Sequence, residues 1–135
     1  MEAVSTVLDN PKFSKRSVIW TGRILSGLTI LALGMSGAMK LSHHPKVIEQ
    51  FIGRFGFSEG LLTPIGILEI SCALLYLIPG TSTFGAILVT AYLGGATVTH
   101  VRVGDPFIIP VVLGVIAWAG LYLRDERVRQ LIRMR

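Results

Sequence analysis

Apolar residues dominate four long stretches of the chain, and short polar segments separate these stretches. They cover residues 18–39, 61–78, 84–101 and 107–123. Each is close to the roughly 20 residues, at about 1.5 Å per residue, that a helix needs to cross a bilayer. The pattern therefore predicts an all-α membrane protein, built as a bundle of four transmembrane helices.

The polar segments divide the chain into three parts. Residues 1–17 are expected to form a cytoplasmic N-terminal arm, residues 18–123 the four-helix transmembrane domain, and residues 124–135 a basic cytoplasmic tail with five arginines. A signal peptide is the alternative for the first apolar stretch. Arg23 within it and its length favour a retained span.

The connection between the first two stretches has a pattern of its own. Val47, Phe51 and Phe55 recur at helical spacing, as do Ile48 and Ile52, and charged residues lie between them. This spacing predicts a short amphipathic helix that lies at the membrane interface. Its aromatic side chains would also be able to cover the mouth of the bundle.

Composition and charge support a membrane protein. Hydrophobic residues make up 51% of the chain and charged residues only 16%, well below the roughly 25% of a soluble domain. With four spans, the side of the termini holds nine basic residues and the opposite side four. The positive-inside rule then places both termini in the cytoplasm, and we expect the bacterial inner membrane. Topology thus explains the net charge of +5, without nucleic acid as a partner.

Two residue types exclude classes of site. The single cysteine, Cys72, rules out a disulfide within the chain and is expected to be an inert packing residue. The adjacent His43 and His44 lack a third ligand at useful spacing, so no metal site is expected.

One carboxylate, Glu69, lies in the middle of the second apolar stretch. An ionised side chain at that depth normally faces a bundle interior or a wet cavity and marks a functional site. Gly66, Cys72, Ala73 and Tyr76 share its helical face, and small residues let helices approach closely. We therefore expect Glu69 to point inward. The alternative is a protonated Glu69 that only hydrogen-bonds a neighbouring helix.

Further polar residues gather at the outer ends of the first three predicted spans. If these helices pack together, Glu69 at the bottom and Lys40 and His100 at the rim would line one small-molecule pocket. Glu69 and His100 are the candidate catalytic residues, because such groups exchange protons or hold a polar head such as a quinone carbonyl. The candidate ligand-binding residues are Lys40, Tyr92, Thr97, Arg102 and Asp105. Structural roles stay open: interface anchors for Lys40 and Arg102, a carbonyl cap for His100 and a turn for Asp105.

Small residues predict two further packing faces. Ala91, Gly95 and Thr99 form a ladder at spacing four in the third stretch. Gly114, Ala117 and Gly120 recur at spacing three in the fourth. Both are expected to allow close helix contacts.

The residues quoted above also resemble a known pattern. From Val18 to Arg124 the chain is similar to the DoxX-like family of small bacterial membrane proteins. The motifs that carry the resemblance are Trp20-x-x-Arg23, Ser36-Gly37-Ala38-Met39-Lys40-Leu41, Gly66-Ile67-Leu68-Glu69-Ile70, Ile78-Pro79-Gly80, Gly85-Ala86-Ile87-Leu88 and Tyr92-Leu93-Gly94-Gly95-Ala96-x-x-x-His100-x-x-x-Gly104-Asp105. The resemblance implies a four-helix membrane bundle and a quinone-linked or redox-partner role. It makes Lys40, Glu69, His100 and Asp105 the positions to test.

Four functions follow from these features. The first is a quinone- or redox-linked membrane subunit with a pocket for a small lipophilic ligand around Glu69 and His100. The others are an acid–base isomerase for a lipophilic substrate, a proton-coupled small-molecule transporter, and a structural subunit. No cofactor site is visible in the chain, so a redox role requires a bound quinone or a protein partner. The expected partners are the lipid bilayer, a small lipophilic molecule, and a protein partner or further copies of the chain.

Overall fold

Four long helices form the body of the protein. The computed structural model describes residues 2 and 15–134, and within them all regular structure is helical. The predicted N-terminal arm lies outside the described residues except for Glu2 and the start of the first long helix. The long helices are α2 (Lys15–Leu41), α4 (Leu62–Leu77), α5 (Ser82–Arg102) and α6 (Ile108–Arg124). The short ones are α3 (Pro45–Ile48), the π-helix η1 (Glu49–Arg54), the 3-10 helix η2 (Glu59–Leu61) and α7 (Glu126–Arg133).

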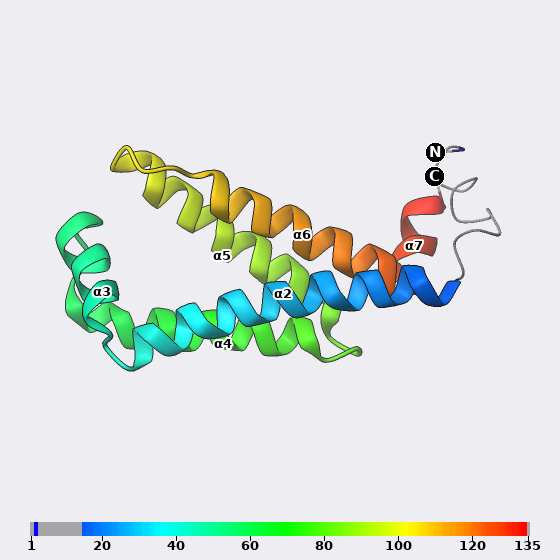
Figure 1. Cartoon of the computed structure of the whole chain (residues 1–135), viewed down its shortest axis with the longest axis horizontal. Coiled ribbons are helices and arrows are strands. Elements are labelled where there is room, and N and C mark those ends of the chain that lie inside the picture. The colour runs from blue at the N-terminus through cyan, green and yellow to red at the C-terminus, as the bar shows by residue number, and fades with distance from the viewer. Residues whose placement is uncertain (1, 3–14, 135) are drawn as a thin grey trace.

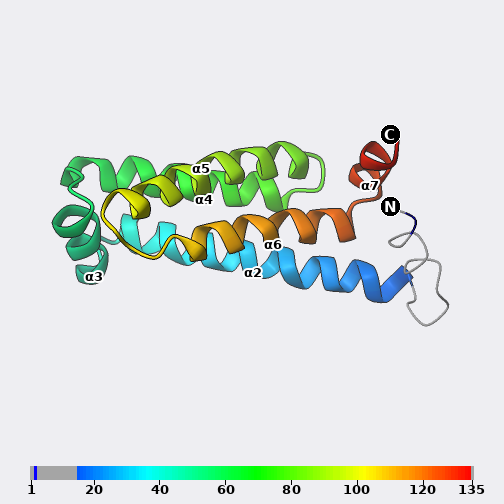
Figure 2. The same ribbon diagram turned by 90° about the horizontal axis from the view of Figure 1, so that it is seen from above.

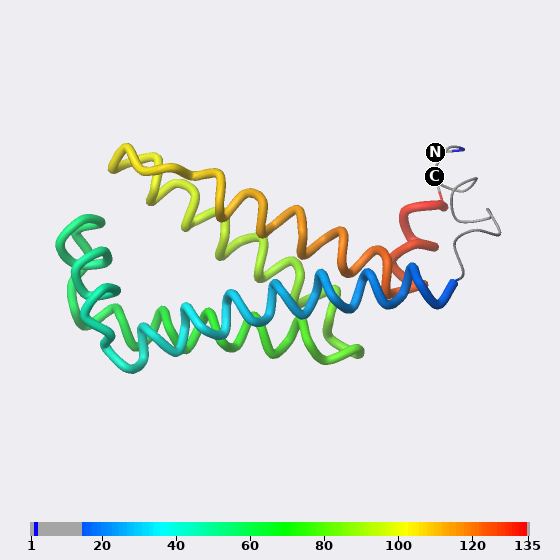
Figure 3. The backbone as a smooth tube through the Cα atoms, viewed as in Figure 1, coloured from blue at the N-terminus to red at the C-terminus, as the bar shows by residue number. Residues whose placement is uncertain are grey.

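The long helices pack in a ring. Helix α2 contacts α4 and α6, and α5 contacts the same two helices from the other side. The α5–α6 pair diverges from the α2–α4 pair toward the end where α3 lies (Figure 1). Figure 2 gives the same arrangement from above. The start of α2 and helix α7 lie together at the opposite end (Figure 3).

The apolar helices make this an all-helical membrane protein with three to four candidate spans. Helix α2, the segment Glu59–Leu77 and α5 are each long and apolar enough to cross a bilayer. Helix α6 has 17 residues and qualifies only together with α7, from which a bend of 97° separates it. Each predicted apolar stretch thus lies on one long helix, apart from single residues at the ends of the second and fourth stretches.

Glycines set the distances between these helices. A Cβ at Gly85 would lie 2.2 Å from the Tyr76 nitrogen, so α4 and α5 touch backbone to backbone there. Between α2 and α6, a Cβ at Gly120 would lie 2.7 Å from Ser26 Oγ. The predicted packing face of α6 is thus confirmed at Gly120, and Ala117 beside it is buried. The ladder in the third stretch is not a buried face within the bundle, because Ala91 and Gly95 are exposed and Thr99 is only partly buried.

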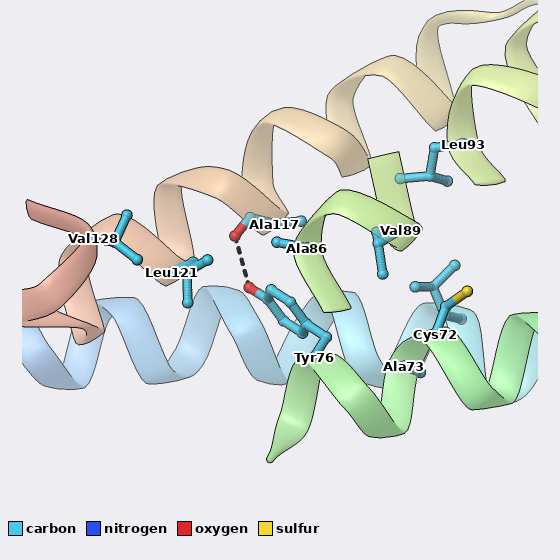
Figure 4. Close-up of a cluster of buried hydrophobic side chains, with 10 residues drawn as sticks. Cys72, Ala73, Tyr76, Ala86, Val89, Leu93, Ala117, Leu121 and Val128 are labelled. Carbon is cyan, nitrogen blue, oxygen red and sulfur yellow. Dashed lines mark hydrogen bonds between the residues drawn. The ribbon is translucent and has the colours of Figure 1, made fainter. Parts of the chain in front are cut away.

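Tyr76 lies at the centre of the main core. Its side chain is fully buried, and its hydroxyl donates a hydrogen bond of 2.7 Å to the carbonyl of Ala117 in α6 (Figure 4). The same hydroxyl lies 2.9 Å from Ser26 Oγ in α2. One phenol therefore joins three helices and satisfies its own polar group in an apolar interior.

The connection after α2 forms a cap, here defined as residues 45–61, on the end of the bundle opposite α7 (Figure 1). This end is called the outer end and the other the inner end, as names for the two ends of the bundle. Phe51 and Phe55 are buried and pack with Leu62 at the start of α4. The predicted helix is present, but η1 has π rather than α geometry. Its position at a membrane interface stays a prediction.

The basic tail contains a helix that its sequence pattern did not predict. Asp125 begins α7 by accepting a hydrogen bond of 3.0 Å from the Arg127 backbone nitrogen. Burial alone would raise the pKa of Asp125, but the hydrogen bonds from Arg127 outweigh burial and hold the pKa below its ordinary value. The carboxylate thus remains charged at the N-terminus of the helix, where it is stabilising.

Candidate functional site: a buried ion pair between α2 and α4

Glu69 forms an ion pair with Lys40 inside the bundle. Lys40 Nζ lies 2.7 Å from Glu69 Oε2, and only 2% of the Glu69 side chain and 12% of the Lys40 side chain are exposed. The ammonium also donates a hydrogen bond of 2.7 Å to Ser36 Oγ, one turn back along α2. The inward orientation predicted for Glu69 is confirmed, and its face of α4 is buried as expected: Gly66, Cys72, Ala73 and Tyr76.

Two glycines bring the charged residues together. A Cβ at Gly37 would lie 3.2 Å from the Gly66 carbonyl, and one at Gly66 would lie 3.1 Å from the Gly37 carbonyl and from Lys40 Cβ. Helices α2 and α4 run in opposite directions at this contact (Figure 1). Helical side chains lean toward the N-terminus of their own helix. Lys40 therefore leans down into the bundle while Glu69 leans up toward the outer end, and the two meet.

Helix α5 adds a phenol to the pair. The Tyr92 side chain interacts with the Glu69 carboxylate. The Cys72 thiol is also close enough to interact electrostatically with this carboxylate. The site thus combines an ammonium, a carboxylate and a phenol from three helices, surrounded by apolar side chains. Such a set both donates and accepts hydrogen bonds and is able to hold a proton.

A second group of predicted residues gathers at the cap. The His100 ring meets the Phe55 ring edge-on with centroids 5.0 Å apart, and its Nδ1 lies 2.7 Å from the Ala96 carbonyl. Arg102 donates a hydrogen bond to the Phe55 carbonyl. Asp105, with 8% of its surface exposed, forms an ion pair with Arg54. These residues hold the cap against the end of α5.

The two groups are separate along α5. His100 follows Tyr92 by eight residues, or about 12 Å at the helical rise. No hydrogen bond or ion pair links His100 to Glu69 or Lys40 among the described residues. The single pocket predicted around Glu69 and His100 is thus divided between an ion pair within the bundle and a contact at the cap.

Thr97 points to a third place. Its hydroxyl donates a hydrogen bond of 2.7 Å to the Leu93 carbonyl, and its side chain lines a groove on the exposed surface of α5 and α6. Across residues 2 and 15–134, no three side chains of His, Cys, Asp or Glu gather where they would hold a metal ion.

The family model of the DoxX-like family matches residues 24–120. The chain belongs to the DoxX-like family. The matched range includes the ion pair, His100 and Asp105. No curated protein and no solved structure matches the chain. For this DoxX-like protein the family thus supports the membrane fold, and the functional argument depends on the site.

Sequence reasoning missed several residues of this DoxX-like site. Ser36 contacts Lys40 and was detectable, because residues four apart share a helix face. Arg54 and Phe55 contact the predicted residues Asp105 and His100, but they lie about 50 residues away in the sequence. No local pattern signals such long-range contacts.

Proposed function

We propose that this protein crosses the bacterial cytoplasmic membrane four times, with both termini in the cytoplasm. Three long apolar helices and the shorter apolar α6 support the four spans. The described ends of the chain lie at one end of the bundle (Figure 3). Nine of the thirteen basic residues belong to that side in a four-span topology, which supports a cytoplasmic location.

We further propose that Lys40, Glu69 and Tyr92 hold the polar head of a small lipophilic molecule, with a quinone as the class. The buried ion pair of 2.7 Å carries this proposal. Charged groups in a bilayer interior are costly and mark functional positions. Lys40 and Tyr92 would donate hydrogen bonds to a carbonyl oxygen, and Glu69 would hold or release a proton beside it.

A quinone, when bound, carries two electrons and two protons through the membrane. The protein's own contribution is then to orient the head and to hold a proton at the Glu69 carboxylate. Electrons would come from a partner protein, which makes the chain a redox-linked subunit rather than a complete enzyme.

The geometry favours this function over two alternatives. An isomerase that passes one proton between Glu69 and His100 needs both groups at one substrate, but His100 lies about two helical turns along α5 from Tyr92, the residue of that helix beside Glu69. A proton-coupled exporter of cations needs a carboxylate whose charge is free to attract a cation. Here Lys40 already neutralises Glu69.

Thermal unfolding with a soluble quinone tests the proposal. The full chain, purified in mild detergent, is titrated with decylubiquinone while its unfolding temperature is recorded. Binding to the native state alone raises that temperature with ligand concentration. We expect the unfolding temperature of the unmodified protein to rise. In Glu69→Gln the same rise should need about ten times more ligand, because one charge-assisted hydrogen bond is lost.

Two variants complete the test. Glu59→Gln is the matched control, because this carboxylate is exposed at the cap and should leave the response unchanged. Tyr92→Phe removes a single hydrogen-bond donor and leaves the ion pair between Lys40 and Glu69 intact, and it should weaken the response. The same response in all three variants, or none in the unmodified protein, would show that the ion pair is structural.

A further inference from the structure

A groove follows the exposed surface of α5 and α6 and ends against α7. It encloses about 640 Å³, and its lining includes Gly94 on α5, Gly114 on α6 and Ile132 on α7. On α6 the lining extends from Pro110 to Tyr122, which is about 18 Å at the helical rise. One leaflet of bilayer hydrocarbon is about 15 Å thick. The groove thus has the length of a lipid acyl chain.

Away from its α7 end, the polar side chains of the groove are satisfied within the protein. Trp118 Nε1 donates a hydrogen bond of 2.7 Å to Thr90 Oγ1, which itself donates one of 2.8 Å to the Ala86 carbonyl. Thr97 donates to its own helix. Apart from Tyr122 at the α7 end, the walls therefore offer apolar contact and no free hydrogen-bonding group, as an acyl chain requires.

The end of the groove at α7 is different, because it is basic and has free polar groups. Arg133 directly follows Ile132 in α7 and makes no hydrogen bond or ion pair with any residue in the described part of the chain, although its charge interacts with that of the exposed Glu126, which is paired with Arg129. The Tyr122 hydroxyl likewise has no hydrogen-bond partner there. The 97° bend before α7 turns this helix away from the axis of α6. Its exposed side chains include the apolar Leu131 and Met134.

We propose that this groove binds one acyl chain of an anionic phospholipid, whose phosphate is held at the α7 end by Arg133 and Tyr122. Arginine is well suited to phosphate, and basic segments next to a span attract anionic headgroups. A second copy of the chain is a poorer occupant. Two copies packed side by side in one orientation would bring two arginine-rich α7 ends together, and like charges repel.

Native mass spectrometry of the full chain tests this site. The delipidated protein in mild detergent is incubated with phosphatidylglycerol or phosphatidylcholine, and the bound lipid is counted. We expect one retained phosphatidylglycerol. In Arg133→Gln its affinity should fall about fivefold, the factor that one basic residue contributes at an anionic surface, while phosphatidylcholine binding stays unchanged. Lys46→Gln, at the opposite end of the bundle, is the charge control and should behave as the unmodified protein.

A pair of glycine variants tests the groove itself. A Cβ at Gly94 or at the neighbouring Gly95 would meet no atom within 4 Å, and only Gly94 lines the groove. Leucine favours a helix more than glycine, so both variants should fold. We expect Gly94→Leu to lose both lipids and Gly95→Leu to keep them.

Three outcomes would overturn the proposal. The first is equal retention of lipid by Gly94→Leu and Gly95→Leu. The second is unchanged phosphatidylglycerol binding in Arg133→Gln. The third is a dimer of the unmodified protein that Gly94→Leu abolishes, which would assign the groove to a second copy. None of these outcomes depends on the quinone proposal, because Lys40 and Glu69 are unchanged throughout.

Discussion

At the scale of single residues, the ion pair between Lys40 and Glu69 is unexpected in an apolar membrane interior. Removing two charges from water costs several kcal/mol per ion, and the attraction between them offsets this cost only when the geometry is good. The 2.7 Å distance and the additional hydrogen bond to Ser36 meet that condition. Stability alone is a weak reason to keep such a pair, because an apolar pair of similar volume is often as stable.

Replacing one residue of the ion pair should therefore lower the free energy of unfolding more than replacing both residues. We expect Lys40→Met to lower the free energy of unfolding by about 3 kcal/mol, because the buried Glu69 then loses its oppositely charged partner. The double variant Lys40→Met with Glu69→Leu should recover most of this loss. Reversible unfolding in mixed detergent micelles measures both values. Lys46→Met is the control for the lost lysine, and a double variant as unstable as the single one would contradict the expectation.

The sequence predicted that Glu69 points inward, but not that Lys40 reaches it. A lone carboxylate among apolar and small residues has only one low-energy direction, so its burial follows from composition alone. Lys40 was expected at the rim because its position along α2 is at the outer end. Its long side chain and the close contact at Gly37 and Gly66 let it reach down into the bundle. Helix separation is a tertiary property, and the pattern of one chain does not contain it.

At the scale of the elements, glycine contacts decide how the helices pack. Gly85 is the closest of these contacts, because an added Cβ would meet the backbone of α4 rather than a movable side chain. Overpacking of this kind costs about 1–3 kcal/mol or more. We expect Gly85→Ala to destabilise the protein by at least that amount in thermal unfolding. Gly27→Ala in α2 has open space around its Cβ and should be neutral or slightly stabilising. Equal effects of the two variants would argue against the close contact of α4 with α5.

Helix α7 is an element that the hydrophobic pattern did not reveal. Its apolar residues Val128, Leu131 and Ile132 are few and lie among arginines, so the tail reads as a solvated basic segment. The helix is held both by its cap at Asp125 and by Val128, which is buried in the main core. The π geometry of η1 was also unpredicted, because a single wide turn leaves no clear mark on the spacing of apolar residues. The long apolar helices, by contrast, were predictable since their length alone identifies them.

The cap at Asp125 makes α7 sensitive to charge. Its pKa is lowered in the folded protein, so its contribution is present above the ordinary value of 3.8 and disappears as the pH falls through the lowered value. Asp125→Ala imitates a complete loss of the cap at neutral pH. We expect about a fivefold rise in amide hydrogen exchange across α7, which corresponds to about 1 kcal/mol for an N-cap. The exchange rate in Asp125→Asn should lie between those of the unmodified protein and Asp125→Ala. Unchanged exchange in Asp125→Ala would mean that tertiary packing alone holds α7.

At the scale of the whole molecule, the fold separates two ends with different chemistry. The outer end carries the cap, where Arg54 and Arg102 contact residues far away in the sequence. The inner end carries α7 and the start of α2, with most of the basic charge. The ion pair lies between them, on the side of the bundle nearer the cap. With the proposed topology, a ligand head at Glu69 would therefore be closer to the outer surface of the membrane, while the proposed lipid groove ends at the inner one.

This separation predicts a labelling pattern in intact cells. In a Cys72→Ala background, Glu59→Cys and Pro106→Cys lie in the two outer connections, and Gly80→Cys and Gln130→Cys lie at the inner end. With four spans and cytoplasmic termini, a membrane-impermeant maleimide should label the first two from outside. The other two should react only after the membrane is permeabilised. Labelling of Gln130→Cys without Gly80→Cys would show that α6 and α7 do not complete a fourth span. Labelling of the inner pair alone would reverse the orientation, so that a ligand at Glu69 would face the cytoplasmic side.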